Sequence, residues 1–416
     1  MSIRLPNTMK RDQRLHIGIT CNIKESKQEA QTAGHAATLD AGAGFDEPAS
    51  PQAIQPATPA ASAEFGHPST IQATQLSTLE ADAEFDDPAT IQAIQRAFEY
   101  IGHTVEIFNA TPDLPQRLLQ SRPDFIFNIA EGKGGRGRES HVPALLNFLG
   151  IPFSGSDETT MCVTLDKALT KRILMSYGIV TPKYARAALD PRTASRSTAN
   201  PSAEPAGYTI KEGMLDTLDF PLIVKPNAEG SGMGISETSL VSNNEELQQV
   251  LAELACTYEQ DILIEEYIDG REFCVGILGN GADLRVFTPM EVVFGKNTQG
   301  IYTFTVKQDF RNYVRYACPP ELSAPDIDHL MATARNIYGI LECRDFARLD
   351  FRLSEENELH FLEVNPLPGL APDYSDYPIL AEFNGVDYTS LIAGILDSAL
   401  ARYGMTNPSL NKEARK

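Results

Sequence analysis

The chain has 416 residues, of which 42% are hydrophobic, and a formal net charge of -21. This length predicts two or three domains with cores of their own, and the acidic charge excludes a nucleic-acid backbone or an anionic membrane as a partner, because both require a basic protein surface. Six scattered cysteines without a Cys-x-x-Cys pair indicate neither a zinc site nor a disulfide framework, and without a membrane span or a signal peptide we expect a cytoplasmic protein that binds small molecules.

Near the N-terminus, residues 41–100 contain three imperfect copies of a repeat with a period of 20 residues. A phenylalanine marks the same place in each copy, at Phe45, Phe65 and Phe85. Only the third copy continues into an amphipathic helix, over about 91–101. Three copies rich in Ala, Pro, Ser and Thr are too few for a solenoid. We expect a duplicated insertion at about 25–84 whose first two copies carry no chemistry.

Strands and helices alternate around this insertion. Strands are predicted over about 15–21, 104–108 and 125–129, and this alternation favours an open parallel sheet. The glycine-rich loop 131–138 follows the third strand, at the edge where parallel sheets bind their ligands, and a helix is predicted after it over about 141–149. We expect an N-terminal α/β domain over residues 1–165.

A second unit is predicted over residues 166–260. It begins with a helix from Lys167 to Tyr177 and contains a polar surface loop at 187–207. A strand over 221–225 then leads into a glycine loop. A second strand near 235–241 and a helix capped by Ser242 are predicted after that loop.

The glycine loop contains Gly230, Ser231 and Gly232. A dinucleotide fingerprint requires a helix directly after the glycines, whereas here a strand is predicted. Strand, glycine loop and strand make a flap whose free N–H groups can close over phosphates, although a simple hairpin turn is the alternative. No GxxxxGK[ST] motif occurs, which excludes a P-loop enzyme.

Two lysines near the flap are in positions that suit a bound anion. Lys167 lies in the first turn of its helix, where a cation is unfavourable unless Asp166 or an anion compensates, and a surface pair with a neighbour remains open. Lys225 ends an apolar strand beside the flap and should be bound to something. Further on, the connector at 265–272 can offer backbone groups to an adenine and the Glu272 carboxylate to ribose hydroxyls. The alternative is that this connector is an ordinary loop.

The third unit, residues 261–402, precedes a polar tail at 403–416 and contains an acidic hairpin. Its alternating strands place Asp350 opposite Glu363 and Arg348 opposite Asn365. Two carboxylates about 5 Å apart repel each other unless a cation lies between them. Two acids and an amide form an all-oxygen set that suits Mg²⁺, and the arginine beside them suits a metal-bound phosphate. The alternative is a solvated hairpin face.

Five segments, taken in order, resemble the ATP-grasp superfamily and above all its D-alanine:D-alanine ligases. These segments are LDKALTKRIL, FPLIVKPNAEGSGMGIS, ILIEEYIDGREF, ARLDFRL and FLEVNPLPGL. A sixth, FNIAEGKGGRGRESHVPALLNFLGIPFSGSD, is also similar, so the resemblance covers about residues 85–400. It implies an α/β fold in which an N-terminal open parallel sheet domain is followed by two ATP-grasp subdomains that enclose the nucleotide.

The resemblance also implies a role for each matching residue. ATP would be bound by Lys167, Lys225, Gly230, Ser231, Gly232, Glu265, Glu266, Tyr267, Ile268 and Glu272. Lys307 would reach the transferred phosphate, Arg348 would stabilise the developing charge, and Asp350, Glu363 and Asn365 would bind two Mg²⁺ ions. The implied reaction is ADP-forming ligation, in which a carboxylate becomes an acyl phosphate and an amine then displaces the phosphate.

The chain departs from this family where substrates bind. The acid-bearing loop after the first strand is replaced by TCNIKESKQ, and the family's histidine in the later loop is Glu131 here. Substrate contacts are expected from Glu131, Arg136, Arg138, Glu139, Asp373, Tyr374 and Ser375. These departures favour a ligase of other amino acids or small metabolites in specialised biosynthesis. A D-alanine ligase of peptidoglycan synthesis and a non-catalytic ATP-binding regulator are the alternatives, and a homodimer is expected by analogy.

Overall fold

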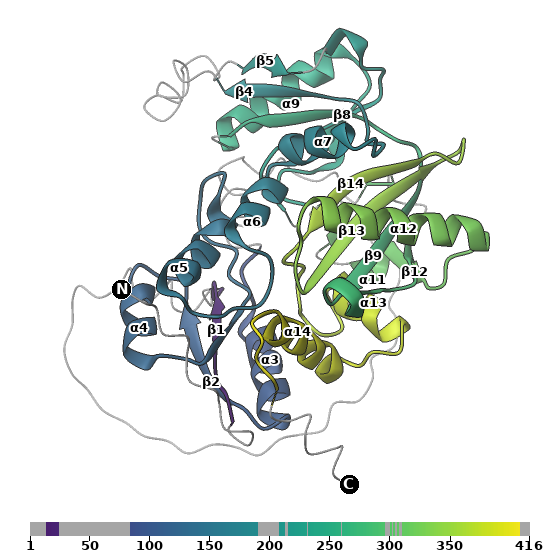
Figure 1. Ribbon diagram of the computed structural model, residues 1–416. Coiled ribbons are helices and arrows are strands. Elements are labelled where there is room, and N and C mark those ends of the chain that lie inside the picture. Colours follow the sequence, from purple (N-terminus) through teal and green to yellow (C-terminus); the bar gives the residue numbers. More distant parts are fainter. Residues whose placement is uncertain are drawn as a thin grey trace, which may run out of the picture.

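The computed structural model describes residues 14–24, 84–189, 208–212, 215–230, 232–258, 260–295, 300–301, 303, 306–307 and 310–407. The first two repeat copies, most of the polar loop at 187–207, Ser231 and the end of the predicted tail lie outside these residues. Three sheets organise the described part of the chain, and Figure 1 shows them as three neighbouring bodies. The predicted α/β class is confirmed.

The N-terminal sheet is parallel and has the order β2-β1-β3. Its strands and the helices of this part of the chain are β1 (His16–Cys21), α3 (Pro88–Tyr100), β2 (Thr104–Asn109), α4 (Leu114–Ser121), β3 (Phe125–Asn128), α5 (His141–Leu149) and α6 (Glu158–Leu165). The predicted open parallel sheet is therefore confirmed. Helix α3 starts three residues before the predicted bound because Asp87 accepts a hydrogen bond from the Ala89 N–H and Pro88 occupies the first turn.

The central sheet is antiparallel, in the order β5-β4-β8-β6-β7. It is built from β4 (Tyr184–Leu189), β5 (Tyr208–Glu212), β6 (Leu222–Pro226), β7 (Leu240–Val241) and β8 (Ile262–Glu266), together with α7 (Lys167–Ser176) and α9 (Asn244–Thr257). Because β8 pairs with β4 and β6, this sheet extends beyond residue 260, where we had expected the second unit to end.

Two local predictions about the central unit are wrong. The strand expected near 235–241 is only the two residues of β7, because a 3-10 turn at Glu237–Ser239 takes up the preceding chain. The following helix is capped by Asn243, whose side chain accepts from the Glu246 N–H, and not by Ser242. Ser242 instead donates its backbone N–H to the Glu246 carboxylate. The cap therefore lies one residue later, since an asparagine serves that position as well as a serine.

The third sheet has the order β12-β11-β9-β13-β14, with β10 paired to β9. Its elements are β9 (Gly270–Leu278), β10 (Arg285–Val286), β11 (Met290–Phe294), α11 (Phe310–Tyr313), β12 (Val314–Ala317), α12 (Ala324–Ile340), β13 (Phe346–Ser354), β14 (Leu359–Asn365), α13 (Asp376–Phe383) and α14 (Tyr388–Arg402). Helix α14 lies beside α3 of the N-terminal body (Figure 1), and one hydrophobic core runs through both. The N-terminal and C-terminal thirds thus pack against each other through a shared core.

No helix within the described ranges is both long and apolar enough to cross a membrane. The free thiols that the structure describes are Cys21, Cys162, Cys274, Cys318 and Cys343.

Candidate active site

The acidic hairpin forms with the register that the sequence predicted. Strands β13 and β14 pair so that Asp350 is opposite Glu363 and Arg348 is opposite Asn365. A bulge follows directly after Asp350, so the pairing shifts by one residue farther along the hairpin. Bulges re-aim side chains and occur next to active sites. The three predicted metal ligands are therefore next to one another at the end of the hairpin that faces the middle of the molecule.

Arg348 is buried and is held between two carboxylates. Its guanidinium lies 2.9 Å from Asp350 and 3.3 Å from Asp376 at the start of α13. Asn365 donates to the same Asp350 oxygen at 3.1 Å. Burial raises the pKa of Asp350, and Arg348 opposes that rise. The sequence did not single out Asp376, which fixes the arginine from the other side.

Glu363, which is opposite Asp350, is surrounded by cations. Lys167 lies 3.5 Å away, and Lys225, Arg348 and Lys307 add their charges. Burial alone would raise the pKa of Glu363, but these four cations lower it to about 2. The carboxylate is therefore ionised throughout the physiological range. Burial, together with the Arg348 charge, lowers the pKa of Lys307.

Lys167 is buried at the start of α7, so the surface pair that the sequence left open does not form. Its ammonium group donates to the Glu229 carbonyl of the glycine flap and faces Glu363. Asp166 caps the helix by accepting from the Leu169 N–H at 2.9 Å. The unfavourable cation at a helix N-terminus is thus compensated by two carboxylates, one of them across the site.

Lys225 has the bound partner that its position predicted. Its ammonium group lies 2.6 Å from one oxygen of Glu265, and Lys171 lies 2.6 Å from the other. Glu265 is only 1% exposed, so its carboxylate contacts these lysines and has little contact with solvent. Lys171 was not predicted, although it follows Lys167 by four residues and therefore shares a face of α7 with it.

The predicted nucleotide residues line a cavity of about 130 Å³ between the central and C-terminal sheets. The lining includes the residues Lys167, Lys225, Gly230, Gly232, Glu265, Glu266, Tyr267, Ile268, Glu272 and Lys307. Glu272 is paired at 2.9 Å with Arg352, whose guanidinium covers the Tyr267 ring at 4.8 Å and donates to the Ile268 carbonyl. Arg352 was missed by the sequence analysis, and it fixes the connector that was predicted to contact adenine.

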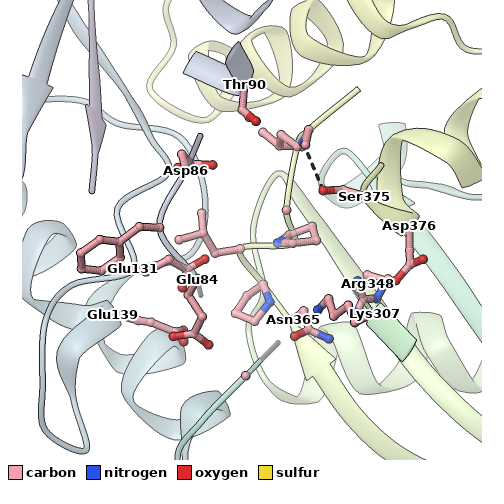
Figure 2. Close-up of a pocket in the computed structure, with 18 of the residues that line it drawn as sticks. Glu84, Asp86, Thr90, Glu131, Glu139, Lys307, Arg348, Asn365, Ser375 and Asp376 are labelled. Carbon is pink, nitrogen blue, oxygen red and sulfur yellow. Dashed lines mark hydrogen bonds and ion pairs between the residues drawn. The ribbon is translucent and has the colours of Figure 1, made fainter. Parts of the chain in front are cut away.

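A larger cavity of about 490 Å³ adjoins the first one. The two cavities share Lys167, Glu229, Gly230, Lys307, Arg348, Glu363 and Asp376 as lining residues. Figure 2 shows Lys307, Arg348 and Asn365 together on one side of the larger cavity and Glu84, Glu131 and Glu139 together on the other. The N-terminal wall therefore carries clustered carboxylates, whereas the C-terminal wall combines the cations Lys307 and Arg348 with the carboxylates Glu363 and Asp376.

The residues predicted to contact substrate fall into two groups. Glu131, Glu139, Tyr374 and Ser375 line the larger cavity, whereas Arg136, Arg138 and Asp373 do not. Arg136 is 63% exposed and pairs at 2.6 Å with Asp166. Asp373 is in a left-handed turn, and its carbonyl accepts from Arg311.

Arg138 is buried and fully engaged inside the protein. It donates to the Ala228 carbonyl at 2.6 Å and lies 2.5 Å from Glu84 and 3.2 Å from Glu229. Its internal partners explain why it does not reach the cavity. It ties the glycine flap to the segment that carries Glu84.

Glu84 is the main site residue that the sequence analysis missed. It was assigned to the last position of the repeat insertion, yet its carboxylate lies within 4.8 Å of those of Glu131 and Glu139. A Cβ on Gly230 would clash with the Glu84 carboxylate, so the glycine lets the flap approach it closely. The only signal in the sequence was that the third repeat copy runs directly into α3.

The three clustered glutamates differ from Glu363 in their electrostatics. Burial and the neighbouring carboxylates raise the pKa of Glu131 well above its ordinary value, and the same causes raise the pKa of Glu139 to about 8. Arg138 opposes both shifts and Lys167 opposes that of Glu139, but burial and the neighbouring carboxylates outweigh these cations. The N-terminal wall is arranged to receive a positive charge.

Comparison with known proteins agrees with this geometry. The sequence profile described as "D-ala D-ala ligase C-terminus" matches residues 195–397. A D-alanine–D-alanine ligase of Aquifex aeolicus is 31% identical over 312 residues, which are 73% of this chain and 92% of that protein. The chain belongs to the D-alanine–D-alanine ligase family. It is an ATP-dependent carboxylate–amine ligase with the ATP-grasp fold.

Two further matches extend this family assignment. An uncharacterized protein of Sinorhizobium fredii, y4sG, is 34% identical over 295 residues, covering 70% of this chain and 79% of that protein. The crystal structure of the D-alanine–D-alanine ligase from Bacillus anthracis complexed with ATP superposes with a TM-score of 0.58 over 94% of this chain and 99% of that chain, at 20% identity. At that identity the superposition supports the fold alone.

The hairpin of this family member fits a magnesium ion by its donor chemistry. Asp350 and Glu363 are cross-strand neighbours, and Asn365 adds an amide oxygen beside them. Hard oxygen donors from one or two carboxylates are what Mg²⁺ takes when it also binds substrate phosphates. Lys167 and Arg348 beside the set suit a metal that arrives together with an anion.

Proposed function

We propose that this chain joins two amino acids, and that D-alanine is the pair to test first. The sequence alone favoured other substrates because the family's acid-bearing loop is missing after the first strand. Glu84 now supplies a carboxylate at the cavity from a different part of the chain. The named relatives that are D-alanine–D-alanine ligases support the same choice.

The difference between the two walls of the larger cavity is the observation that carries this proposal. An amino acid presents an ammonium group and a carboxylate, and the cavity offers clustered carboxylates on one wall and, on the other, Lys307 and Arg348 among their own carboxylate partners. ATP would lie in the smaller cavity, against Lys225 and the connector at 265–272. Its terminal phosphate would reach the residues that both cavities share. The reacting carboxylate and the phosphate would therefore meet at the junction between the two cavities.

The reaction has two balanced steps. A carboxylate oxygen of the first amino acid attacks the terminal phosphorus of ATP, the bond to the bridging oxygen breaks, and ADP leaves. The amine of the second amino acid then attacks the acyl carbon, loses a proton, and inorganic phosphate leaves with formation of the peptide bond.

In this proposal, Lys307 and Arg348 act by placing positive charge where the phosphoryl group moves. Arg348 is held for this task by Asp350 and Asp376. Asp350, Glu363 and Asn365 would hold Mg²⁺, which when bound neutralises phosphate charge. The glycine flap, tied to Glu84 through Arg138, would exclude water from the acyl phosphate.

An assay with pairs of amino acids tests the proposal. The protein is incubated with MgATP and D-alanine, L-alanine or other amino acids, and phosphate release and product mass are measured. D-alanine-dependent phosphate release with a dipeptide product is the expected result. Turnover with a different pair of amino acids would support a ligase of specialised biosynthesis instead. ATP binding without turnover on any pair would favour the regulator. Light scattering tests the expected homodimer.

A further inference from the structure

Lys171 is a buried lysine that the proposed reaction does not use. It is on α7 with 0% of its surface exposed, and it lines neither cavity. Its ammonium group lies 2.6 Å from one oxygen of Glu265, 2.7 Å from the Thr181 hydroxyl and 3.5 Å from the Phe361 carbonyl. Burying a lysine costs free energy, so a fully enclosed one calls for an explanation.

The explanation begins with the other oxygen of Glu265. That oxygen lies 2.6 Å from the ammonium group of Lys225, which lines the smaller cavity. The three residues come from α7, β6 and β8, and α7 lies beside β8 in Figure 1. They form a chain in which one carboxylate is shared by two ammonium groups, one enclosed and one facing the cavity.

Counting charges shows what the enclosed lysine contributes. Two ammonium groups and one carboxylate leave a surplus of one positive charge. Without Lys171, Lys225 and Glu265 would form a neutral pair at the cavity wall. Because charges interact strongly where water is excluded, a surplus charge beside the cavity favours an anion there.

The pKa shifts of Lys225 and Glu265 agree with that count, whereas burial opposes the charge of Lys171, which its contact with Glu265 supports. Burial alone would lower the pKa of Lys225, but Glu265 and Glu363 raise it. Burial would raise the pKa of Glu265, but the two lysines lower it. Burial lowers the pKa of Lys171, and Glu265 opposes that change. The carboxylate is thus ionised and Lys225 is charged.

We propose that Lys171 is a positioning residue that neutralises Glu265 and so leaves the charge of Lys225 free for a phosphate group of the nucleotide. This inference rests on the proposed function only in placing ATP in the smaller cavity. It requires nucleotide binding and does not require that any particular amino acid is the substrate.

The test measures the dissociation constant of ATP by calorimetry for four variants of the full chain. Lys171→Met should weaken ATP binding by roughly tenfold or more, since Lys225 then forms a neutral pair with Glu265 and its charge-assisted contact to the phosphate weakens. Lys171→Arg should retain most of the affinity. Adding Glu265→Gln to Lys171→Met removes one negative charge, restores the surplus of one positive charge and should recover the affinity. Lys183→Met is the matched control, because Lys183 is 63% exposed and pairs with Glu266 nearby.

The double variant separates charge balance from packing. If Lys171 only fills space, Lys171→Met/Glu265→Gln should bind ATP as weakly as Lys171→Met or more weakly, and the proposal is overturned. An unchanged ATP affinity in folded Lys171→Met overturns it as well. Should Lys171→Met fail to fold, the double variant alone decides, because the proposal requires it to bind ATP nearly as well as the wild type. Wild-type protein that binds ATP without ligating any amino acids would contradict the proposed function and leave this test valid.

Discussion

Two glutamates on opposite walls of the larger cavity have pKa values that are shifted in opposite directions. Glu363 on β14 has a pKa of about 2, and Glu139 in the loop after β3 has a pKa of about 8. Burial would raise the pKa of both groups. The difference arises because four cations outweigh burial at Glu363, whereas at Glu139 burial and the charges of Glu84 and Glu229 outweigh those of Arg138 and Lys167.

This difference shows how each wall is prepared. The hairpin wall holds its carboxylate ionised with its own cations, so it can take a metal ion and a phosphate without reorganising. On the N-terminal wall, burial and the neighbouring carboxylates raise the pKa values of Glu131 and Glu139, so a cation from a ligand would favour their ionised forms. One wall is therefore complete in the protein alone, and the other is completed by its ligand.

A substitution in the hairpin wall should have the largest effect on ligase activity. Glu363→Gln removes the ionised carboxylate and one metal ligand, and we expect ligase activity to fall at least about a hundredfold. The melting temperature should stay close to that of the wild type, because Glu363 faces the cavity. Phosphate release at saturating MgATP measures the loss. Glu358→Gln, in the exposed turn of the same hairpin, is the matched control and should remain active. Full activity in Glu363→Gln would contradict the magnesium site.

Breaking the N-terminal wall should change substrate binding instead. Glu84→Gln removes a charge that would meet the substrate ammonium, so KM for the amino acid should rise about 10- to 100-fold. KM for ATP should hardly change. Steady-state kinetics with each substrate varied in turn measure this split, and Glu99→Gln on the exposed face of α3 is the control. An equal rise in both KM values would mean that Glu84 acts on the flap and not on the amine.

The sequence predicted the residues of the hairpin wall better than those of the N-terminal wall. The hairpin is a local feature, since alternating residues and a short turn fix which of Asp350, Glu363 and Asn365 share a face. The parallel N-terminal sheet, Lys167 of α7 and Lys225 of β6 were likewise predicted from local patterns. Their ion-pair partners across the fold were not.

What the sequence missed depends on tertiary contacts. Glu84 follows a long repeat insertion and reaches Arg138, which also pairs with Glu229, only in the folded chain. Arg138 was predicted to contact substrate, but its buried guanidinium is held by three internal partners and does not line the larger cavity. Lys171 and Arg352 stabilise carboxylates that are distant in sequence, so no spacing rule identifies them.

A pH titration tests the raised pKa of Glu139 on the N-terminal wall. Glu139 is faced by Glu84, Glu229, Arg138 and Lys167, and its raised pKa means that it is protonated below about pH 8. Only the ionised form attracts an ammonium group, so affinity for the amino acid should increase as pH rises toward 8. In Glu139→Gln this increase should be reduced to a few-fold or less. The profile of kcat/KM for the amino acid against pH measures it, and identical slopes in both proteins would contradict the assignment.

The smallest effect is expected at Arg136, where sequence and structure lead to different outcomes. The sequence placed it among the substrate contacts, in which case Arg136→Ala should raise KM for the amino acid tenfold or more. In the fold its exposed guanidinium pairs with Asp166, whose other oxygen still caps α7 and accepts from Asn227. Exposed ion pairs contribute at most about 1 kcal/mol, so KM should change less than about fivefold. A tenfold rise in KM for the amino acid in Arg136→Ala would instead mean that Arg136 contacts the substrate.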